Sequence, residues 1–231
     1  MMQGSSVAFA ASAFVALVYT RWRRKQSSQK PNVAAGNRNE NDCVVTESRC
    51  ALAIQWLRDK NAKVVVFDMD HTMSALHCGN GQPKETLHEY VDAVSPDFVT
   101  FAKALVKCKE FKLAVATGSD PAEYGLPGIS KGTHLCGGDL AVKIIEKHCP
   151  ECLEAFEIMV GYDNKLHGGL PENEGKRYHM REIANHYGVS PEGLVLFDDH
   201  WKNLNNEAGW LGVLVEEPRI GFRFEDIFKH M

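Results

Sequence analysis

Short, mostly apolar stretches alternate along this chain with longer segments whose apolar residues recur at helical spacing. The stretches lie at 64–67, 113–116, 156–160, 194–197 and 211–215. Runs of this length that are rich in Val, Ile and Leu are typical of strands buried on both faces of a parallel sheet. Helical patterns between them predict a three-layer α/β/α sandwich around a central parallel sheet, with right-handed connections.

Helix signals fill the intervals between these stretches. Residues 46–60 indicate a helix, and its expected apolar side consists of Ala51, Ile54 and Leu57 with Trp56. Ser95 followed by Pro96 is typical of a helix start, because Ser caps well and Pro suits the first turn. The expected buried stripe of that helix is Phe98, Phe101, Ala102 and Leu105. We also expect a helix at 138–148 and a flap hairpin around 79–83.

The first strand ends in two carboxylates, Asp68 and Asp70. Because side chains alternate along a strand, these two point the same way. In an open α/β sheet, the carboxyl ends of the strands form the reactive edge. Two acids this close repel each other, so a cation must neutralise them or one must hold a proton. Oxygen ligands at a water-accessible edge suit a hard ion, and we expect Mg²⁺. Taken alone, the motif is equally compatible with a solvated acid pair.

The second strand runs into Thr117 and Gly118. A hydroxyl and the following backbone N–H groups can form an anion-binding concavity, although the same residues also suit a plain turn. Lys176 opens the next feature, a helical stretch that continues with Met180, Ile183, Ala184 and Tyr187. This spacing puts the ammonium on the core-facing side; the alternative is a solvated charge.

The last feature is the pair Asp198 and Asp199 after the stretch 194–197, with Asn203 shortly behind. The pair can complete a metal site or cap a helix that begins near residue 200. If the strands are parallel, all these residues and Lys176 meet at one edge of the sheet.

In this order the four motifs resemble the haloacid dehalogenase superfamily of phosphohydrolases over about 63–215. Receiver domains of response regulators use similar residues, but their acidic pair comes first in the chain, whereas Asp198 and Asp199 come last here. The resemblance implies a Rossmann-like fold, a Mg²⁺ cofactor and phosphomonoester hydrolysis. A dehalogenase needs the nucleophile but not Asp70, so phosphoryl chemistry is favoured over carbon–halogen chemistry.

The resemblance also implies a role for each residue. Asp68 is the expected nucleophile, which becomes an aspartyl-phosphate, and Asp70 the expected general acid and base. Thr117, Gly118 and Lys176 are expected to hold the phosphoryl group. The implied metal ligands are Asp68, Asp70 through its carbonyl, Asp198 and Asp199, with support from Asn203.

The spacing of the motifs bears on the substrate. The intervals from Asp68 to Thr117 to Lys176 to Asp198 are 49, 59 and 22 residues. The expected elements fill most of this length, so we expect no large cap domain and an open cleft, partly covered by the loop 120–136. The motif at Asp198 most resembles the small magnesium-dependent phosphatase branch. An open cleft suits a phosphoprotein or a phosphorylated small molecule such as a sugar phosphate.

Charge is unevenly distributed along the chain. Residues 1–43 carry six basic and two acidic side chains, so the remaining 188 residues hold a net −8 within the overall −4. An acidic domain without a basic stripe argues against extended nucleic-acid binding, where phosphate contacts dominate affinity. Seven scattered Cys do not form a disulfide framework and favour a reducing compartment. Cys149 and Cys152 make a lone Cys-x-x-Cys, which is half a zinc site or a pair of plain thiols.

The N-terminus forms a separate region. Residues 1–25 combine a 13-residue apolar run with a basic flank. We expect 26–43 to be a polar, disordered tether and 44–231 to be the phosphatase domain that the resemblance implies. The first segment is compatible with a membrane anchor that keeps the domain cytoplasmic, with a presequence for the mitochondrion or plastid, or with a disordered tail. The run is short for a membrane span.

Three functions are therefore compatible with the sequence. The first is a Mg²⁺-dependent phosphatase with Asp68 as nucleophile. The second is a phosphotransferase or phosphomutase that uses the same aspartyl-phosphate. The third is a non-catalytic, membrane-tethered scaffold on the same fold. His179 and His200 lie near the motifs, and each is a candidate for substrate contact or a partly buried helix residue.

Overall fold

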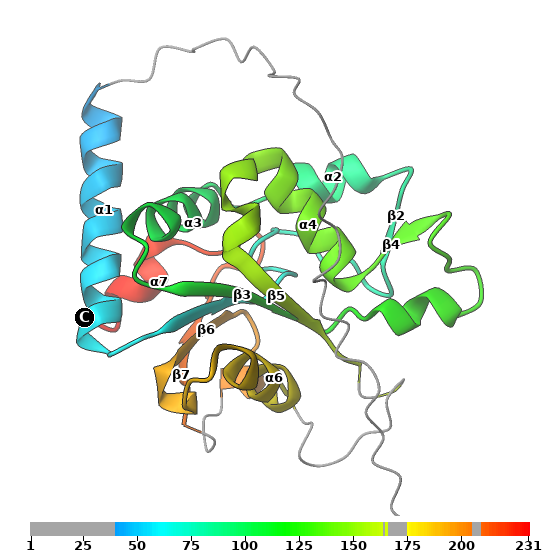
Figure 1. Cartoon of the computed structure of the whole chain (residues 1–231). Helices are drawn as coiled ribbons and strands as arrows, with labels where there is room; N and C mark the ends of the chain where they lie inside the picture. Colours follow the sequence, from blue (N-terminus) through cyan, green and yellow to red (C-terminus); the bar gives the residue numbers. More distant parts are fainter. Residues whose placement is uncertain (1–39, 164, 166–174, 205–208) are drawn as a thin grey trace, which may run out of the picture. The chain divides into compact units, whose positions relative to one another are not determined.

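A computed structural model describes residues 40–163, 165, 175–204 and 209–231. Its centre is a five-stranded parallel sheet with the strand order β5-β3-β1-β6-β7 (Figure 1). The strands are β1 (Val64–Phe67), β3 (Lys112–Thr117), β5 (Phe156–Gly161), β6 (Leu194–Asp198) and β7 (Leu211–Leu214). Each coincides, within one or two residues at either end, with a stretch predicted from the sequence. The α/β architecture with a central parallel sheet is thereby confirmed.

The strand that carries the first acidic pair lies in the middle of the sheet. β1 pairs with β3 on one side and with β6 on the other, and Phe67 is level with Val115 and Phe197. The carboxyl ends of these three strands therefore reach the same edge together. Residues that follow them directly in the sequence become neighbours there.

Helices cover both faces of the sheet, which gives the three predicted layers (Figure 1). Val65 and Phe67 belong to a core shared with residues of α1 (Glu40–Asp59), α3 (Pro96–Cys108), α4 (Gly137–His148) and α7 (Phe224–Phe228). Val64 and Val66 belong to a second core shared with α6 (Arg177–Tyr187). The alternation along β1 thus supplies both faces, as expected for a strand buried on both sides.

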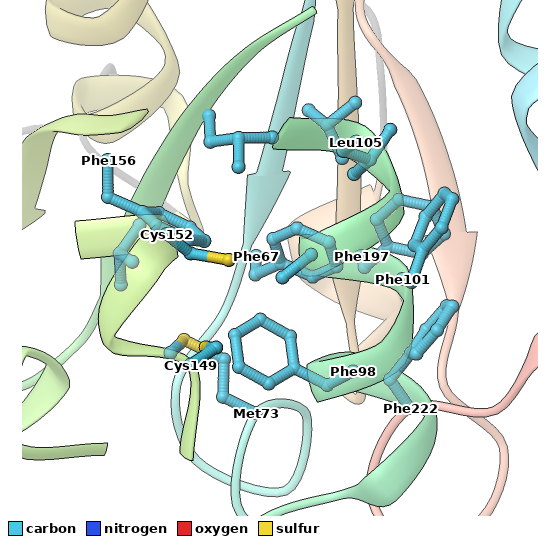
Figure 2. Close-up of a cluster of buried hydrophobic side chains, with 14 of the residues drawn as sticks. Phe67, Met73, Phe98, Phe101, Leu105, Cys149, Cys152, Phe156, Phe197 and Phe222 are labelled. Carbon is cyan, nitrogen blue, oxygen red and sulfur yellow. The ribbon is translucent and has the colours of Figure 1, made fainter. Parts of the chain in front are cut away.

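Aromatic rings fill much of the first core around Phe67, the last residue of β1 (Figure 2). The ring of Phe67 stacks on Phe197 with 5.2 Å between centroids and meets Phe98 edge-on at 5.1 Å. Phe98 comes from α3, whose buried residues are the four predicted ones, and the side chain of Ser95 caps the helix by accepting a hydrogen bond from the backbone N–H of Phe98 at 3.1 Å. Offset and edge-on ring pairs add to the stabilisation that burial alone provides.

The loops at the carboxyl edge differ from the expected hairpin. β2 (Gln82–Pro83) pairs antiparallel with β4 (His134–Leu135), which lies in the loop after β3. The expectation of a self-contained flap hairpin is wrong, because the partner strand is about 50 residues away in sequence. Gly81 has φ +103, and a Cβ there would lie 2.5 Å from the Cys136 Sγ, so the two loops pack tightly. In the described part of these loops no separate cap domain is formed.

The remaining described elements are short: α2 (Leu87–Asp92) and the 3₁₀ helices η1 (Pro121–Gly125), η2 (Pro150–Ala155), η4 (Pro191–Gly193) and η5 (Trp201–Leu204). The six cysteines whose side chains are described are free thiols. Cys149 and Cys152 lie in the aromatic core (Figure 2), and both are buried.

The first helix differs from its prediction in two respects. α1 begins at Glu40 rather than at 46, so the last four residues assigned to the tether are helical. Its buried side includes Ala53 rather than Ala51, which is exposed. The segment 1–25 and most of the tether lie outside the described residues. Among the described helices, none has both the length and the apolar character that a membrane crossing needs.

Candidate active site

The side chains of Asp68 and Lys176 meet at the carboxyl edge of the sheet. Lys176 precedes α6 directly and occupies its N-cap position. Its Nζ donates a hydrogen bond to Asp68 Oδ1 at 2.7 Å and another to the carbonyl of Ala116 at 2.7 Å. Both side chains are almost completely buried: 5% of the Lys176 side chain and 9% of the Asp68 side chain are exposed. The solvated-charge alternative for Lys176 is therefore wrong.

Asp198 lies on the other side of the same ammonium, with its Oδ2 3.8 Å from the Lys176 Nζ. Asn203 holds this carboxylate by donating from Nδ2 to both oxygens, at 2.8 and 3.0 Å. The backbone N–H of His200 donates to Oδ1 at 2.8 Å. These bonds orient the Asp198 carboxylate at the turn that leads into η5, where the backbone N–H of Lys202 donates instead to His200 Nδ1 at 3.3 Å.

Three carboxylates gather closely enough to share one ion. One oxygen each from Asp68, Asp198 and Asp199 lie within 4.8 Å of one another. The first two are buried and the third is half-buried. Three carboxylate oxygens at this spacing suit a hard divalent cation such as Mg²⁺. The carboxylate of Asp70 does not belong to this cluster in the described part of the chain.

Burial and crowding disfavour negative charge at these carboxylates. Burial raises the pKa of Asp68 to about 8, and the charges of Asp198 and Asp70 add to the effect, although Lys176 opposes it. Burial likewise raises the pKa of Asp198 against the influence of Lys176, the His200 N–H and Asn203. A bound dication would reverse this balance, because it favours the ionised carboxylates. The electrostatics therefore fit a metal site.

The segment after β3 leaves room above Asp68. Thr117 is buried, and its Oγ1 accepts a hydrogen bond from the backbone N–H of Ser119 at 3.2 Å. Gly118 follows, and a Cβ at this position would meet no atom within 4 Å. Together with Asp68 and Lys176, Gly118 lines a cavity of about 340 Å³. Its other lining residues are Tyr162, Asp163, Lys165, Gly175, His179 and Asn203.

The carboxylate of Asp70 is held by a separate set of groups. Its Oδ1 accepts hydrogen bonds from the Tyr90 hydroxyl and from the backbone N–H of Cys78, the latter at 3.1 Å. Its Oδ2 lies 2.7 Å from His77 Nδ1 and 3.3 Å from the Cys78 Sγ. Burial alone would raise the pKa of Asp70, but hydrogen bonds from His77 and Tyr90 outweigh it, so that the pKa is lowered. The same contact raises the pKa of His77.

The structure therefore brings Asp68, Lys176, Asp198, Asp199 and Asn203 together. It places Thr117 and Gly118 at the end of the neighbouring strand and turns the Asp70 carboxylate towards residues 77–90. His179 is buried and bonded through Nε2 to the Thr117 carbonyl at 2.8 Å, besides lining the cavity.

Sequence reasoning missed two groups of site residues. Tyr162 and Asp163 line the cavity because they follow the carboxyl end of β5 directly. The rule that residues after parallel strands meet at one edge could have found them. His77, Cys78 and Tyr90 carry no comparable signal, since only the folded path of the loop brings them to Asp70.

Comparisons with known proteins add little to this geometry. No family model matches the chain, and no curated protein matches it. Among solved structures, the chain is similar to a hydrolase of the haloacid dehalogenase-like family from Streptococcus pneumoniae, with 10% sequence identity and a TM-score of 0.39. The alignment covers 74% of this chain and 98% of that one. A likeness of this size leaves the chemistry to be argued from the side chains.

Proposed function

We propose that the chain is a Mg²⁺-dependent phosphomonoester hydrolase that works through an aspartyl-phosphate on Asp68. The observation that carries the proposal is the convergence of Asp68, Asp198 and Asp199 around one point, with the Lys176 ammonium 2.7 Å from Asp68. The order of the motifs supports it, because the same residues in the same order occur in the haloacid dehalogenase superfamily.

The chemistry needs two displacements at phosphorus. An oxygen of Asp68 attacks the phosphoryl group, the ester P–O bond breaks, and the leaving oxygen takes a proton from Asp70. Water then attacks the aspartyl-phosphate, Asp70 accepts its proton, and the bond to Asp68 breaks to release inorganic phosphate. The donors around Asp70 favour its ionised form, which suits the second step, in which it accepts a proton from water; the first step uses its protonated form. Lys176 and the groups at Thr117 and Gly118 would neutralise and orient the phosphoryl oxygens, since phosphoryl transfer depends mainly on positioning and charge.

The residues present fit a bound Mg²⁺. Asp68 and Asp198 would hold it, with Asp199 acting directly or through water and the Asp70 carbonyl as a further oxygen ligand. When bound, the ion supplies positive charge that offsets the charge building up on the phosphoryl oxygens. Asn203 and the His200 N–H would keep the Asp198 carboxylate oriented, as supporting hydrogen bonds do around metal ligands.

The substrate is expected to be a phosphorylated small molecule or a phosphoprotein. The cavity beside Asp68 holds about 340 Å³, which accommodates a phosphoryl group and part of a leaving group. Its walls include Asp163 and Lys165, so polar leaving groups suit it better than apolar ones. The assignment to the small magnesium-dependent branch remains a prediction, as does the exclusion of nucleic acid.

The test is phosphate release by the full chain from p-nitrophenyl phosphate with and without Mg²⁺. We expect release that depends on the metal and that Asp68→Asn abolishes, with an unchanged circular dichroism spectrum. Asp59→Asn, which removes an exposed carboxylate at the end of α1, is the matched control and should leave the rate unchanged. Activity that persists in Asp68→Asn contradicts the proposal. Transfer of the phosphoryl group to an added alcohol instead of water would identify a phosphotransferase.

A further inference from the structure

The two halves of the candidate active site are held by different parts of the chain. Asp68 is bonded to Lys176, and Asp198 to Asn203 and the His200 N–H. The four groups that donate to Asp70 come instead from one segment, 77–90, which leads from the loop after β1 into α2. The orientation of the Asp70 side chain therefore depends on this segment.

Within this segment, the Tyr90 side chain is held in place by burial. Only 1% of its surface is exposed, so its hydroxyl reaches Asp70 from within the core. The backbone around it is tied to the loop that follows Asp70: Ser74 Oγ donates to the Tyr90 carbonyl at 3.0 Å, and the Ala75 N–H donates to the Ala93 carbonyl at 2.8 Å. These bonds leave the phenol little freedom to move away from the carboxylate.

His77 approaches the other oxygen of Asp70 from the solvent side, with 62% of its side chain exposed. Its ring stacks on that of His71, with 5.7 Å between centroids and 18° between planes. His71 is itself in place, because its Nδ1 lies 3.1 Å from the Pro218 carbonyl. It also adopts a left-handed backbone, φ +56, directly after Asp70. Because the His77 ring stacks on a ring that is itself held in place, its orientation is defined although it is exposed.

We propose that Tyr90 and His77 are positioning residues for Asp70, which fix its carboxylate where a leaving-group oxygen can take its proton. The inference rests on the proposed function and extends it to residues outside the four motifs. Neither side chain is assigned contact with substrate. Both act by limiting the rotamers of Asp70, and misplacement of a reacting group by about 1 Å can cost roughly 100-fold in rate.

The test compares two phosphate esters whose leaving groups differ in their need for a proton. p-Nitrophenolate leaves readily without one, whereas the alkoxide of glycerol 2-phosphate needs one. The parameter is kcat/KM, because it covers the steps up to ester cleavage and excludes hydrolysis of the aspartyl-phosphate. Tyr90→Phe and His77→Ala in the full chain, with Mg²⁺ present, are expected to lower kcat/KM for glycerol 2-phosphate about tenfold or more, as loss of acid catalysis does. For p-nitrophenyl phosphate the change should stay below about twofold.

Matched controls separate positioning from general damage. Tyr187→Phe removes a hydroxyl that donates to the Leu113 carbonyl at 2.7 Å, away from Asp70, and His88→Ala removes an exposed ring on α2. Neither should change the ratio between the two esters. Because His77 is exposed, its variant is expected to fold even if Tyr90→Phe does not.

Each outcome decides the inference. Equal losses of kcat/KM on both esters, or no loss on glycerol 2-phosphate, would overturn the positioning role. The proposed function would still stand if the wild type releases phosphate and Asp68→Asn does not. A wild-type chain that releases no phosphate from either ester would overturn the proposed function, and the positioning role with it.

Discussion

Three carboxylates and one ammonium meet at the carboxyl edge of the sheet. Burial and the neighbouring carboxylates therefore disfavour the ionised form of Asp68 unless a cation binds. We therefore expect Asp68→Asn to stabilise the metal-free chain at neutral pH. The substitution keeps the shape of the side chain and an oxygen that can accept from Lys176. It removes an acid that ionises in the unfolded chain at neutral pH but keeps its proton in the folded chain. The residue proposed to be essential for turnover would thus lower the stability of the fold.

The magnitude follows from the raised pKa. In the unfolded chain Asp68 ionises near 3.8, whereas in the folded chain it keeps its proton until about pH 8. The unfolded state therefore loses its proton first, and the free energy of unfolding falls as pH rises between these values. Between the unfolded-state pKa and pH 7 lie about three pH units, and each lowers the free energy of unfolding by at most about 1.4 kcal/mol. We expect Asp68→Asn to raise the free energy of unfolding by about 2–4 kcal/mol at pH 7 and by almost nothing near pH 4.

The assay is urea unfolding with a chelator present, from pH 5 to pH 7.5, for the wild type and the variant. Asp199→Asn is the matched control, because it removes a less buried carboxylate from the same cluster and should gain less. Saturating Mg²⁺ should reverse the order, since the wild type then gains a ligand that the variant binds poorly. A variant that is no more stable than the wild type at pH 7 without metal, or a difference independent of pH, would refute the reasoning.

Three further predictions concern other parts of the site and the fold. Lys176→Met should lower kcat/KM for p-nitrophenyl phosphate at least about 100-fold, because it removes the cation beside Asp68; a loss under tenfold would contradict its role. Mg²⁺ should raise the midpoint of thermal unfolding of the wild type in a concentration-dependent way, measured by scanning calorimetry, and Ca²⁺ or chelator alone serves for comparison. Ser95→Ala should lower the free energy of unfolding by about 1–3 kcal/mol, because Ser95 caps α3 through Phe98 and donates to the Phe222 carbonyl; an unchanged urea midpoint would argue against it.

The features that could be predicted from the sequence depend on local patterns. β1 is a run of four apolar residues that is buried on both faces, and the core face of α3 follows from apolar spacing and the Ser95 cap. The convergence of Asp68, Lys176 and Asp198 could also be anticipated, because parallel strands bring their carboxyl ends to one edge. No knowledge of loop paths was required for these.

The features that could not be predicted depend on contacts between distant loops. β2 and β4 contain two residues each, too few for a strand pattern, and they form only because they pair. The rotation of α1 that buries Ala53 and exposes Ala51 follows from its neighbours, since small residues on both sides make the apolar stripe ambiguous. The hydrogen bonds from Tyr90 and His77 to Asp70 likewise require the folded path of the chain.

The aromatic core around Phe67 links the stability of the fold to the proposed phosphatase activity. Phe67 precedes Asp68, and its ring contacts those of Phe98, Phe156, Phe197 and others in the same core. A smaller side chain at any of these positions would loosen the packing around Phe67, one residue away from the proposed nucleophile Asp68. A genetic screen for loss of phosphate release should therefore return core phenylalanines along with the acidic residues, and directed evolution of this scaffold would have to preserve both together.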